Sequence, residues 1–332
     1  MLDFRLKVFY TVAKRLSFTK AAEELFISQP AVTKHIHELE QQLGMALFER
    51  IGNKITITPA GRIVMRYADE IFTSYRNLEY DINQLKHERG GRLQIGASTT
   101  IAQYFIPPLL ARFNQRYPEI KTSLNSGNSE QIEQDLLEKN IQLGIIEGSS
   151  RNPQLKYTEF AKDEIALIGN VNYSYGAGEV LTAAELMAIP LLVREQGSGT
   201  LEVITEELKR LKLKLTDLNI AMYMSSTESM KSYLHHAPGA AFLSLQAVSR
   251  ELEAGEFKIL PVKNFKLVRQ FQFTHLQGQQ DKLAQLFMRF AGKEIKGEKE
   301  KGEAGWKYVM KIWGAALVCY SITGYAVLSA GP

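Results

Sequence analysis

Residues 18–40 read FTKAAEELFISQPAVTKHIHELE, and this stretch decides what kind of fold the chain begins with. Small and apolar residues recur at helical spacing in its first half, which allows a short helix to pack closely against another. Ser28 can cap a second helix, and Pro30 is tolerated in the first turn because the amide that proline lacks would have no intrahelical partner there. The stretch therefore predicts a helix-turn-helix whose second helix begins at Gln29.

The second helix has an apolar side and a polar side. Val32, Ile36 and Leu39 are spaced four and three residues apart, so they face inward. Amide, hydroxyl and lysine groups on the outer side can read base edges and reach phosphates in the major groove. The candidate DNA-binding residues here are Ser28, Gln29, Pro30, Ala31, Thr33, Lys34 and His35. On these residues alone, an ordinary solvated amphipathic helix is the alternative.

The next residues predict a hairpin. Gly44 is a typical helix C-cap, and residues 47–58 have the pattern of strand, glycine-containing turn and strand. Such a hairpin is a wing, and cationic or amide side chains at its tip can approach phosphates or the minor groove. We expect Arg50, Asn53 and Lys54 to contact DNA in this way.

At these positions the sequence resembles the LysR-type transcriptional regulators. The residues that match the family's order and spacing are Phe9, Ala13, Ser17–Thr19, Ala21, Ala22, Leu25, Ser28–Val32, Leu39, Glu40, Leu43, Gly44, Leu47–Arg50 and Thr58–Gly61. Asn53 departs from the pattern, because many members carry an arginine in the wing. The resemblance implies a regulator that binds double-stranded promoter DNA and responds to a small-molecule effector, with RNA polymerase as a further candidate partner.

A long helix is expected behind the wing. Thr58 can cap it and Pro59 suits its first position. Apolar residues then alternate in steps of four and three, which is the heptad seam of a coiled coil. The seam residues are Val64, Ala68, Ile71, Tyr75, Leu78, Ile82 and Leu85. Pairing with a second copy would cover this stripe and make a homodimer, and packing against the helix's own domain is the alternative.

From Arg92 onward, apolar strands alternate with helices, the signature of a parallel sheet with helical crossovers, so the overall fold class is α/β. One expected helix, over residues 101–117, is disturbed by Pro107 and Pro108. The resemblance implies a bilobal, periplasmic-binding-protein-like effector domain. Its lobes would be joined by crossing segments near residues 158–165 and 261–269.

These expectations divide the chain into four parts. They are a winged helix-turn-helix domain (residues 1–58), a dimerisation helix (59–89), an effector domain (91–294) and a tail of unknown role (295–332). Within the effector domain, lobe I would comprise residues 91–161 and 267–294, and lobe II residues 162–266. The effector domains would pair dimers into a homotetramer.

Two hydroxyl-rich segments can bind an anion between the lobes. Each follows a strand and precedes a helix, where backbone amides and the positive end of the helix dipole point. Either segment alone could be a simple helix cap, but matching positions in the two halves favour a binding site. The first contributes Ser98, Thr99 and Thr100, and the second contributes Ser198, Gly199 and Thr200.

Three more residues are candidate effector contacts. Gln103 lies one helical turn after the first hydroxyl segment, and Glu147 and Ser226 each follow a predicted strand. A glutamate beside an anion site would repel the anion. Glu147 therefore fits only if the effector is zwitterionic or if a nearby lysine pairs with it. The resemblance further implies an effector like those of the sulfur-metabolism and small-anion-sensing members.

Composition restricts the other classes of protein. The formal net charge of +4 permits nucleic-acid binding, and a single cysteine, Cys319, gives neither an intramolecular disulfide nor a cysteine zinc site. We find no catalytic constellation, no metal motif and no cofactor motif in the sequence. A transport-type solute-binding protein would share the bilobal fold. It would need an export signal, which we do not find, and it would have no reason to carry a winged helix, so the sequence argues against this class. We therefore expect a cytoplasmic, nucleoid-associated regulator that is not an enzyme.

The tail adds one alternative. Residues 312–330 contain no charged side chain, and a run of that length could span a bilayer. Several polar residues make the run only moderately apolar, so a membrane-tethered regulator is the less favoured reading.

Overall fold

The computed structural model describes residues 3–51, 54–85, 90–149, 151–176, 180–278 and 281–301. By its internal contacts the chain forms two units. The first comprises residues up to 91 together with 278–283, and the second comprises residues 92–277 together with those from 284 onward. Each unit is described by itself.

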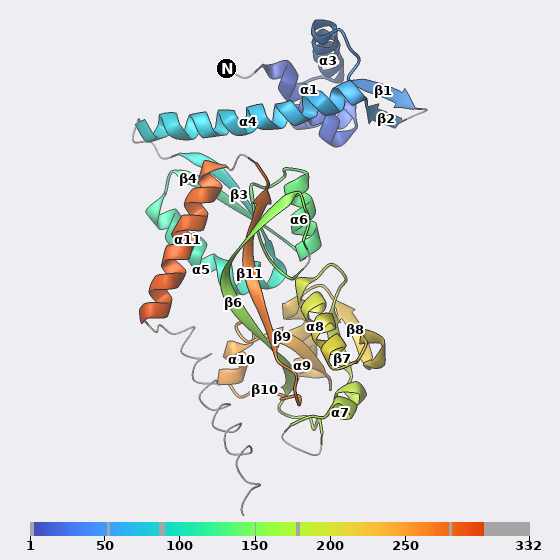
Figure 1. Cartoon of the computed structure of the whole chain (residues 1–332), viewed down its shortest axis with the longest axis vertical. Helices are drawn as coiled ribbons and strands as arrows, with labels where there is room; N and C mark the ends of the chain where they lie inside the picture. Colours follow the sequence, from blue (N-terminus) through green and yellow to red (C-terminus); the bar gives the residue numbers. More distant parts are fainter. Residues whose placement is uncertain are drawn as a thin grey trace, which may run out of the picture. The chain divides into compact units, whose positions relative to one another are not determined.

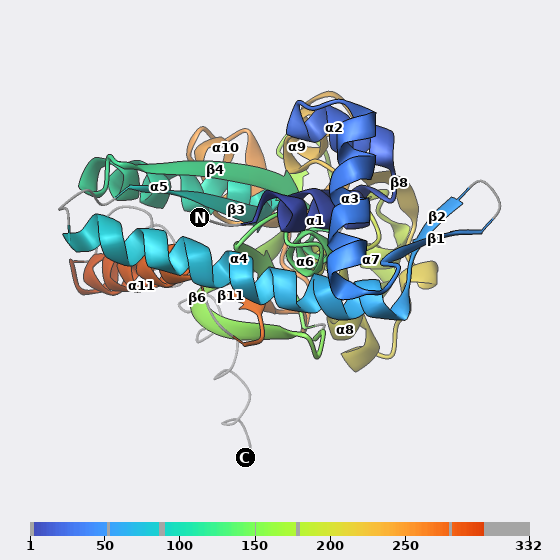
Figure 2. The same cartoon turned by 90° about the horizontal axis from the view of Figure 1, so that it is seen from above.

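The first unit begins with three helices and a hairpin (Figure 1). They are α1 (Phe4–Arg15), α2 (Phe18–Leu25), α3 (Gln29–Leu43), β1 (Phe48–Ile51) and β2 (Lys54–Ile57). This order and these bounds confirm the predicted winged helix-turn-helix. Figure 2 shows the β1–β2 hairpin projecting from the helices.

Local chemistry explains where the helices of this unit begin and end. The Ser28 side chain accepts a hydrogen bond from the Ala31 amide at 3.4 Å and so caps α3, and Gly44 ends that helix in the left-handed conformation. Val32, Ile36 and Leu39 are buried in one core with residues of α1 and α2, as predicted. Because the apolar side of α3 packs in that core, the polar side of the helix faces solvent.

Helix α4 (Pro59–Leu85) follows the hairpin, with Thr58 at its start. The Thr58 hydroxyl accepts a hydrogen bond from the Gly61 amide at 3.0 Å, as expected of a cap. The last residues of the predicted helix, 86–89, lie outside the described residues.

The second unit is built on a nine-stranded sheet with helices packed on it. Its strands are β3 (Gly91–Ser98), β4 (Ile120–Gly127), β5 (Leu143–Glu147), β6 (Leu155–Asn170), β7 (Leu191–Arg194), β8 (Ile220–Met224), β9 (Ala240–Ser244), β10 (Phe257–Ile259) and β11 (Leu267–Leu276). Its helices are α5 (Ile106–Arg116), α6 (Ser129–Leu137), α7 (Ala183–Ala188), α8 (Gly199–Arg210), α9 (Thr227–His236), α10 (Ser249–Glu253) and α11 (Lys282–Lys301), with short turns η1 (Ile101–Phe105) and η2 (Leu215–Asp217).

Two long antiparallel strands, β6 and β11, run through the middle of this sheet and join its two halves (Figure 1). The sheet order is β4-β3-β5-β11-β6-β9-β7-β8, so one lobe lies on the β5 side and the other on the β9 side. The first crossing strand covers the predicted segment 158–165. The second starts later than predicted, because residues near Pro261 pair with Leu181 inside the second lobe, with the Leu181 amide donating to the Pro261 carbonyl at 2.7 Å.

Alternation along the strands buries both faces of the sheet in the second lobe. Leu191 and Val193 of β7 join a core that includes α8, whereas Leu192 joins a separate core that includes α9. Side chains alternate across a strand, so helices on opposite faces each cover one set. This arrangement brings the start of α8 to the carboxyl end of β7.

The predicted helix 101–117 is divided in two. Residues 101–105 form a π-helical turn, and α5 begins at Ile106 with Pro107 and Pro108 in its first positions. Prolines are tolerated there because those amides have no intrahelical partner.

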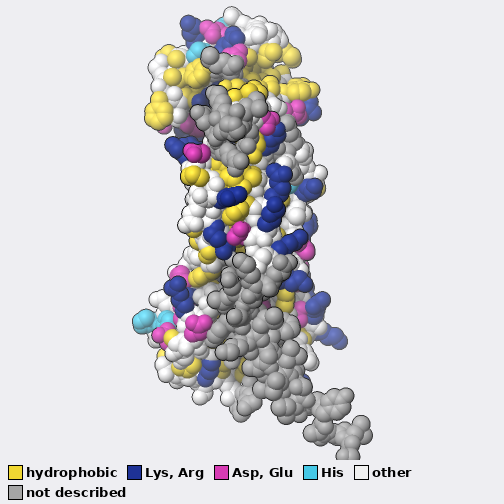
Figure 3. Space-filling view, turned by 90° about the vertical axis from the view of Figure 1, so that its left-hand side faces the viewer, with side chains coloured by type: hydrophobic (Ala, Val, Ile, Leu, Met, Phe, Trp, Pro, Cys, Tyr) yellow, Lys and Arg dark blue, Asp and Glu magenta, His cyan; other side chains and the backbone are white. Residues whose placement is uncertain are grey.

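Helix α11 closes the chain that the structure describes. Figure 3 shows Lys and Arg side chains gathered on one face of the second unit, and Arg289, Lys293 and Lys296 of α11 are exposed. Among the helices that the structure describes, none combines the length and apolar composition of a bilayer-spanning segment. The predicted apolar run 312–330 lies outside the described residues.

Candidate functional site

The first turns of α3 present three polar side chains to solvent. The Gln29 side-chain amide donates to the Thr33 hydroxyl at 2.9 Å, and that hydroxyl donates to the Gln29 carbonyl at 3.2 Å. Lys34 is 75% exposed and lies 3.9 Å from the Glu38 carboxylate. A surface ion pair of this kind is weak, so the lysine is available to a phosphate.

Helix α3 and the β1–β2 wing border the same hollow. Thr33 and His37 of α3 and Arg50 of β1 line a hollow of about 240 Å³ in the first unit. The helix and the exposed Arg50 therefore present their polar groups to one side. Asn53 lies outside the described residues, and of Lys54 only its place at the start of β2 is described.

His35 does not lie on the outer side of α3 as predicted. Its ring packs edge-on against Phe4 of α1, with ring centroids 5.3 Å apart, and its Nδ1 lies 3.6 Å from the Glu38 carboxylate. The residue is half-buried because it precedes the inward-facing Ile36 and falls on the α1 side of the helix. Ser28, which caps α3, and Pro30 and Ala31 shape the start of the helix.

Helix α4 carries two apolar faces and not the single predicted seam. Val64 and Ala68 pack toward the core of their own unit, and Ala68 is fully buried. The exposed stripe comprises Ile63, Tyr67, Ile71, Leu78 and Ile82. A hollow of about 550 Å³ runs along part of this stripe, lined by Tyr67, Glu70, Ile71, Ser74, Tyr75 and Leu78.

The two lobes of the second unit meet where the sequence predicted an anion site. Gly199 opens α8 in one lobe and lies against Glu147 at the end of β5 in the other, so closely that a side chain on Gly199 would overlap the Glu147 carbonyl oxygen. Only glycine allows the two lobes this approach. The Glu130 amide also donates to the Gly197 carbonyl at 3.3 Å across the same boundary.

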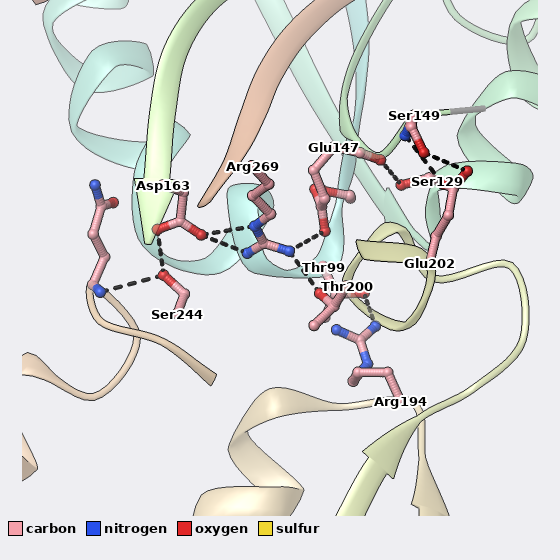
Figure 4. A network of polar contacts seen from close by, with 12 residues as sticks. Thr99, Ser129, Glu147, Ser149, Asp163, Arg194, Thr200, Glu202, Ser244 and Arg269 are labelled. Atoms are coloured by element: carbon pink, nitrogen blue, oxygen red, sulfur yellow. Dashed lines mark hydrogen bonds and ion pairs between the residues drawn. The ribbon is translucent and has the colours of Figure 1, made fainter. Parts of the chain in front are cut away.

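A buried ion cluster occupies this boundary (Figure 4). Arg269 of β11 donates to the Glu147 carboxylate at 3.0 Å and to the Thr200 hydroxyl at 2.6 Å, and it lies 2.7 Å from Asp163 of β6. The Ser98 hydroxyl donates to the other oxygen of the Glu147 carboxylate. Glu147, Arg269 and Asp163 are at most 3% exposed.

The cluster has more acidic groups than basic ones. The two carboxyl groups of Glu147 and Asp163 face the single guanidinium of Arg269. Burial raises the pKa of Asp163 above its usual range, although Arg269 and a hydrogen bond from Ser244 oppose this shift. Glu147 is thus paired with an arginine, and not with the lysine that the prediction named.

A second cation lies beside the cluster. Arg194 ends β7, is 2% exposed and donates to the Thr99 hydroxyl at 3.3 Å (Figure 4). It also pairs with Glu195, with 2.9 Å between Nε and the carboxylate. The Ser198 hydroxyl is buried at the start of α8, and it has no hydrogen-bond partner among the described residues. These groups come from the two hydroxyl segments, one in each lobe.

Three predicted effector residues stand apart from this cluster. Thr100 is buried at the start of the π-helical turn, and Gln103 is exposed on that turn. Ser226 caps α9, since its hydroxyl accepts a hydrogen bond from the Ser229 amide at 3.3 Å. None of these three side chains contributes to the hydrogen bonds around Glu147 and Arg194 described above.

The lobes are bridged a second time at α9. The Tyr104 hydroxyl of one lobe donates to Glu228 of the other, and Lys231 donates to Glu228 at 3.0 Å. Burial, together with the neighbouring Glu228, raises the pKa of Tyr104 well above its usual value. The tyrosine therefore remains a neutral donor across the physiological range.

Arg194 and Arg269 were not among the predicted site residues. Arg269 could have been found, because it falls on the same face of its strand as the apolar Leu267 and Phe271. A charged residue on a buried face requires a partner. Within the described ranges, no group of His, Cys, Asp or Glu side chains has the geometry of a metal site.

Comparison with known families matches both units. Residues 4–62 match the bacterial regulatory helix-turn-helix protein, lysR family, and residues 86–296 match the LysR substrate binding domain. The chain is 31% identical over 270 residues to the HTH-type transcriptional regulator CysL of Bacillus subtilis (strain 168), covering 81% of this chain and 89% of that protein. It is also 31% identical over 287 residues to the transcriptional activator CmpR of Synechocystis sp. (strain ATCC 27184 / PCC 6803 / Kazusa), covering 86% of this chain and 93% of CmpR.

One similar solved structure contains a ligand. The Synechocystis PCC6803 CcmR regulatory domain in complex with 2-PG is 26% identical, with a TM-score of 0.56, and the match covers 61% of this chain and 96% of that one. The winged helix, the bilobal unit and these matches together establish that the chain belongs to the LysR family of DNA-binding transcriptional regulators.

Proposed function

We propose that this regulator reads promoter DNA with the first turns of α3 and with the wing, and that it senses a small anion between the lobes of its second unit. The reading residues are Gln29, Thr33, Lys34 and Arg50, whose side chains are exposed, and Thr33 and Arg50 line one hollow. His35 is left out, because its ring packs against α1. The protein then acts as a ligand-gated switch on DNA in the cytoplasm, and not as an enzyme.

The active form is at least a dimer. The exposed stripe from Ile63 to Ile82 supports this, since a helix that leaves several large apolar side chains in water gains free energy by pairing. We propose the division into a winged domain (1–58), a pairing helix (59–89), an effector domain (91–294) and a tail (295–332).

The ligand is a small anion that binds at the start of α8. The observation that carries this proposal is the buried Ser198 hydroxyl, which no described residue satisfies, together with the buried Arg194, which donates a hydrogen bond to Thr99. Helix N-termini favour negative charge, and an arginine with converging hydroxyls adds charge-assisted hydrogen bonds. The structure of the similar CcmR regulatory domain in complex with 2-PG supports a small-molecule ligand for this domain.

A thermal-shift screen of the full chain tests this proposal. Sulfate, phosphate, 2-PG, O-acetylserine and small carboxylates are compared at constant ionic strength. A ligand present at one hundred times its Kd stabilises the fold by about 2.7 kcal/mol, which is a measurable shift. Arg194→Gln should abolish the shift, whereas Arg116→Gln, a change of an exposed arginine on α5, should leave it intact. The anion site is wrong if both variants respond like the parent protein, or if none of these ligands stabilises the parent.

A further inference from the structure

We propose that Glu147 is a tethered ligand of the effector site: its carboxylate holds the two lobes together when no effector is bound, and the effector's acid group replaces it. This inference rests on the proposed anion site at the start of α8. It concerns how that site is occupied and regulated by the chain itself.

The contacts of Glu147 are those expected of a bound anion. Its side chain is buried, and its carboxylate accepts a hydrogen bond from Ser98 on one oxygen and one from Arg269 at 3.0 Å on the other. Ser98 is one of the hydroxyls that the sequence predicts for an anionic effector. In the described structure that hydroxyl is already engaged by a carboxylate of the chain.

The same side chain reaches the start of α8. The Glu147 backbone and its side-chain Cγ lie against Gly199, and Arg269 joins the carboxylate to the Thr200 hydroxyl with a contact of 2.6 Å. Glu147 belongs to one lobe, and Gly199 and Thr200 belong to the other. The carboxylate is therefore linked to the other lobe through Arg269, at the start of a helix, where negative charge is favoured.

Electrostatic repulsion explains why an effector acid group would replace the Glu147 carboxylate and not bind beside it. With Asp163 also paired to Arg269, the cluster has one acidic group more than it has basic groups. A further anion entering beside Glu147 would meet a like charge in a buried site, which is costly. An effector acid group can enter at low cost only if the Glu147 carboxylate withdraws, and withdrawal releases the contact between the lobes. Ligand binding and lobe position are thereby linked.

Glu147→Gln tests the exchange, with sulfate as the probe. Glutamine keeps the shape of the side chain but removes its charge, so sulfate should bind the full chain at least about tenfold more tightly than it binds the parent protein. Titration calorimetry at constant ionic strength measures this ratio. Glu159→Gln, which removes an exposed carboxylate from β6, is the matched control and should leave the affinity unchanged. Unchanged or weaker sulfate binding by Glu147→Gln would overturn the proposal.

A second measurement without ligand tests the tether directly. Amide hydrogen exchange over residues 196–204 should be faster in Glu147→Gln than in the parent chain, because the loss of the charge weakens the hold on Arg269, which donates a hydrogen bond to Thr200 at the start of α8. Ser98→Ala, which removes one donor to the carboxylate, should shift exchange in the same direction and serves if the first variant folds poorly. Equal exchange rates in the parent and both variants would contradict the tether.

Different results would contradict the anion site and the tethered-ligand inference. If an anion stabilises the parent chain and depends on Arg194, but Glu147→Gln does not bind it more tightly, only the tethered-ligand inference falls. If no anion binds to the parent chain, the anion site itself is wrong, and the tethered-ligand inference is wrong with it.

Discussion

Individual side chains on α3 determine what the winged helix can read. Gln29 and Thr33 hold each other through a 2.9 Å hydrogen bond, which limits the rotamers of both side chains. Lys34 is held only weakly, through its 3.9 Å approach to Glu38. The glutamine is therefore suited to base edges, and the lysine to phosphate, which tolerates a range of geometries.

We expect Gln29→Ala and Lys34→Ala to weaken DNA binding in different ways. Loss of a base contact should cost about 1–3 kcal/mol and relax discrimination at one position of the operator. Loss of a phosphate contact should weaken binding to all sequences and lower the slope of log K against log salt by about 1. Footprinting and salt-dependent titrations separate the two effects.

Gln42→Ala is the matched control for this pair, because Gln42 is exposed in the last turn of the same helix. Protection of the operator should survive that change. Unaltered protection by both Gln29→Ala and Lys34→Ala would show that α3 is not the reading helix.

At the scale of elements, α4 shows how one helix serves two surfaces. Ala68 and Val64 cover the core of the winged unit, while Ile71 and Leu78 remain 45% and 54% exposed. The heptad pattern alone assigned all four side chains to one seam. A helix of 27 residues has room for both roles because apolar residues occupy more than one stripe.

We expect Ile71→Glu combined with Leu78→Glu to dissociate the dimer. Each side chain that loses its burial costs about 1.5–3 kcal/mol, and a symmetric interface loses each one twice, so the dissociation constant should rise by at least about a hundredfold. Sedimentation equilibrium measures this change. Glu79→Gln, at an exposed polar position of α4, should leave association intact. If the double variant associates like the parent, the exposed stripe of α4 is not the pairing surface.

At the scale of the whole effector unit, the approach of the two lobes depends on a small residue. The crossing strands β6 and β11 join the lobes covalently, but the lobes touch closely where Gly199 meets Glu147. The bridge from Tyr104 to Glu228 makes a second contact at α9. The relative position of the lobes is thus set by a few side chains and one glycine.

Gly199→Ala should therefore disturb the closed arrangement while sparing DNA binding. The added methyl group overlaps the Glu147 carbonyl oxygen, so the lobes must separate or the chain must lose stability by about 1–3 kcal/mol. The anion-dependent thermal shift should be lost, whereas operator affinity should persist because the winged unit has its own core. Gly292→Ala, where nothing lies within 4 Å of an added Cβ, is the control. An intact ligand response in Gly199→Ala would show that the close contact is not needed.

Much of the fold could be predicted from local sequence. Caps such as Ser28 and Thr58, the C-cap Gly44 and the inward positions of α3 act within a few residues, so their consequences follow from spacing. The strand and helix alternation after Arg92 likewise predicted the α/β class. Ser98, Thr99, Ser198 and Thr200 were predicted at strand and helix ends because those ends gather at one edge of a sheet.

Only the tertiary structure decided what those side chains contact. Arg269 follows Ser98 by a long stretch of chain, and no local pattern indicates that it lies beside Glu147 and Thr200. The inward turn of His35 toward Phe4 also depended on how α1 packs. Local sequence determined the elements because capping and periodicity are short-range. Packing determined which charged side chains pair and which side of a helix faces the core. A buried ion pair exists only when distant strands bring its partners together.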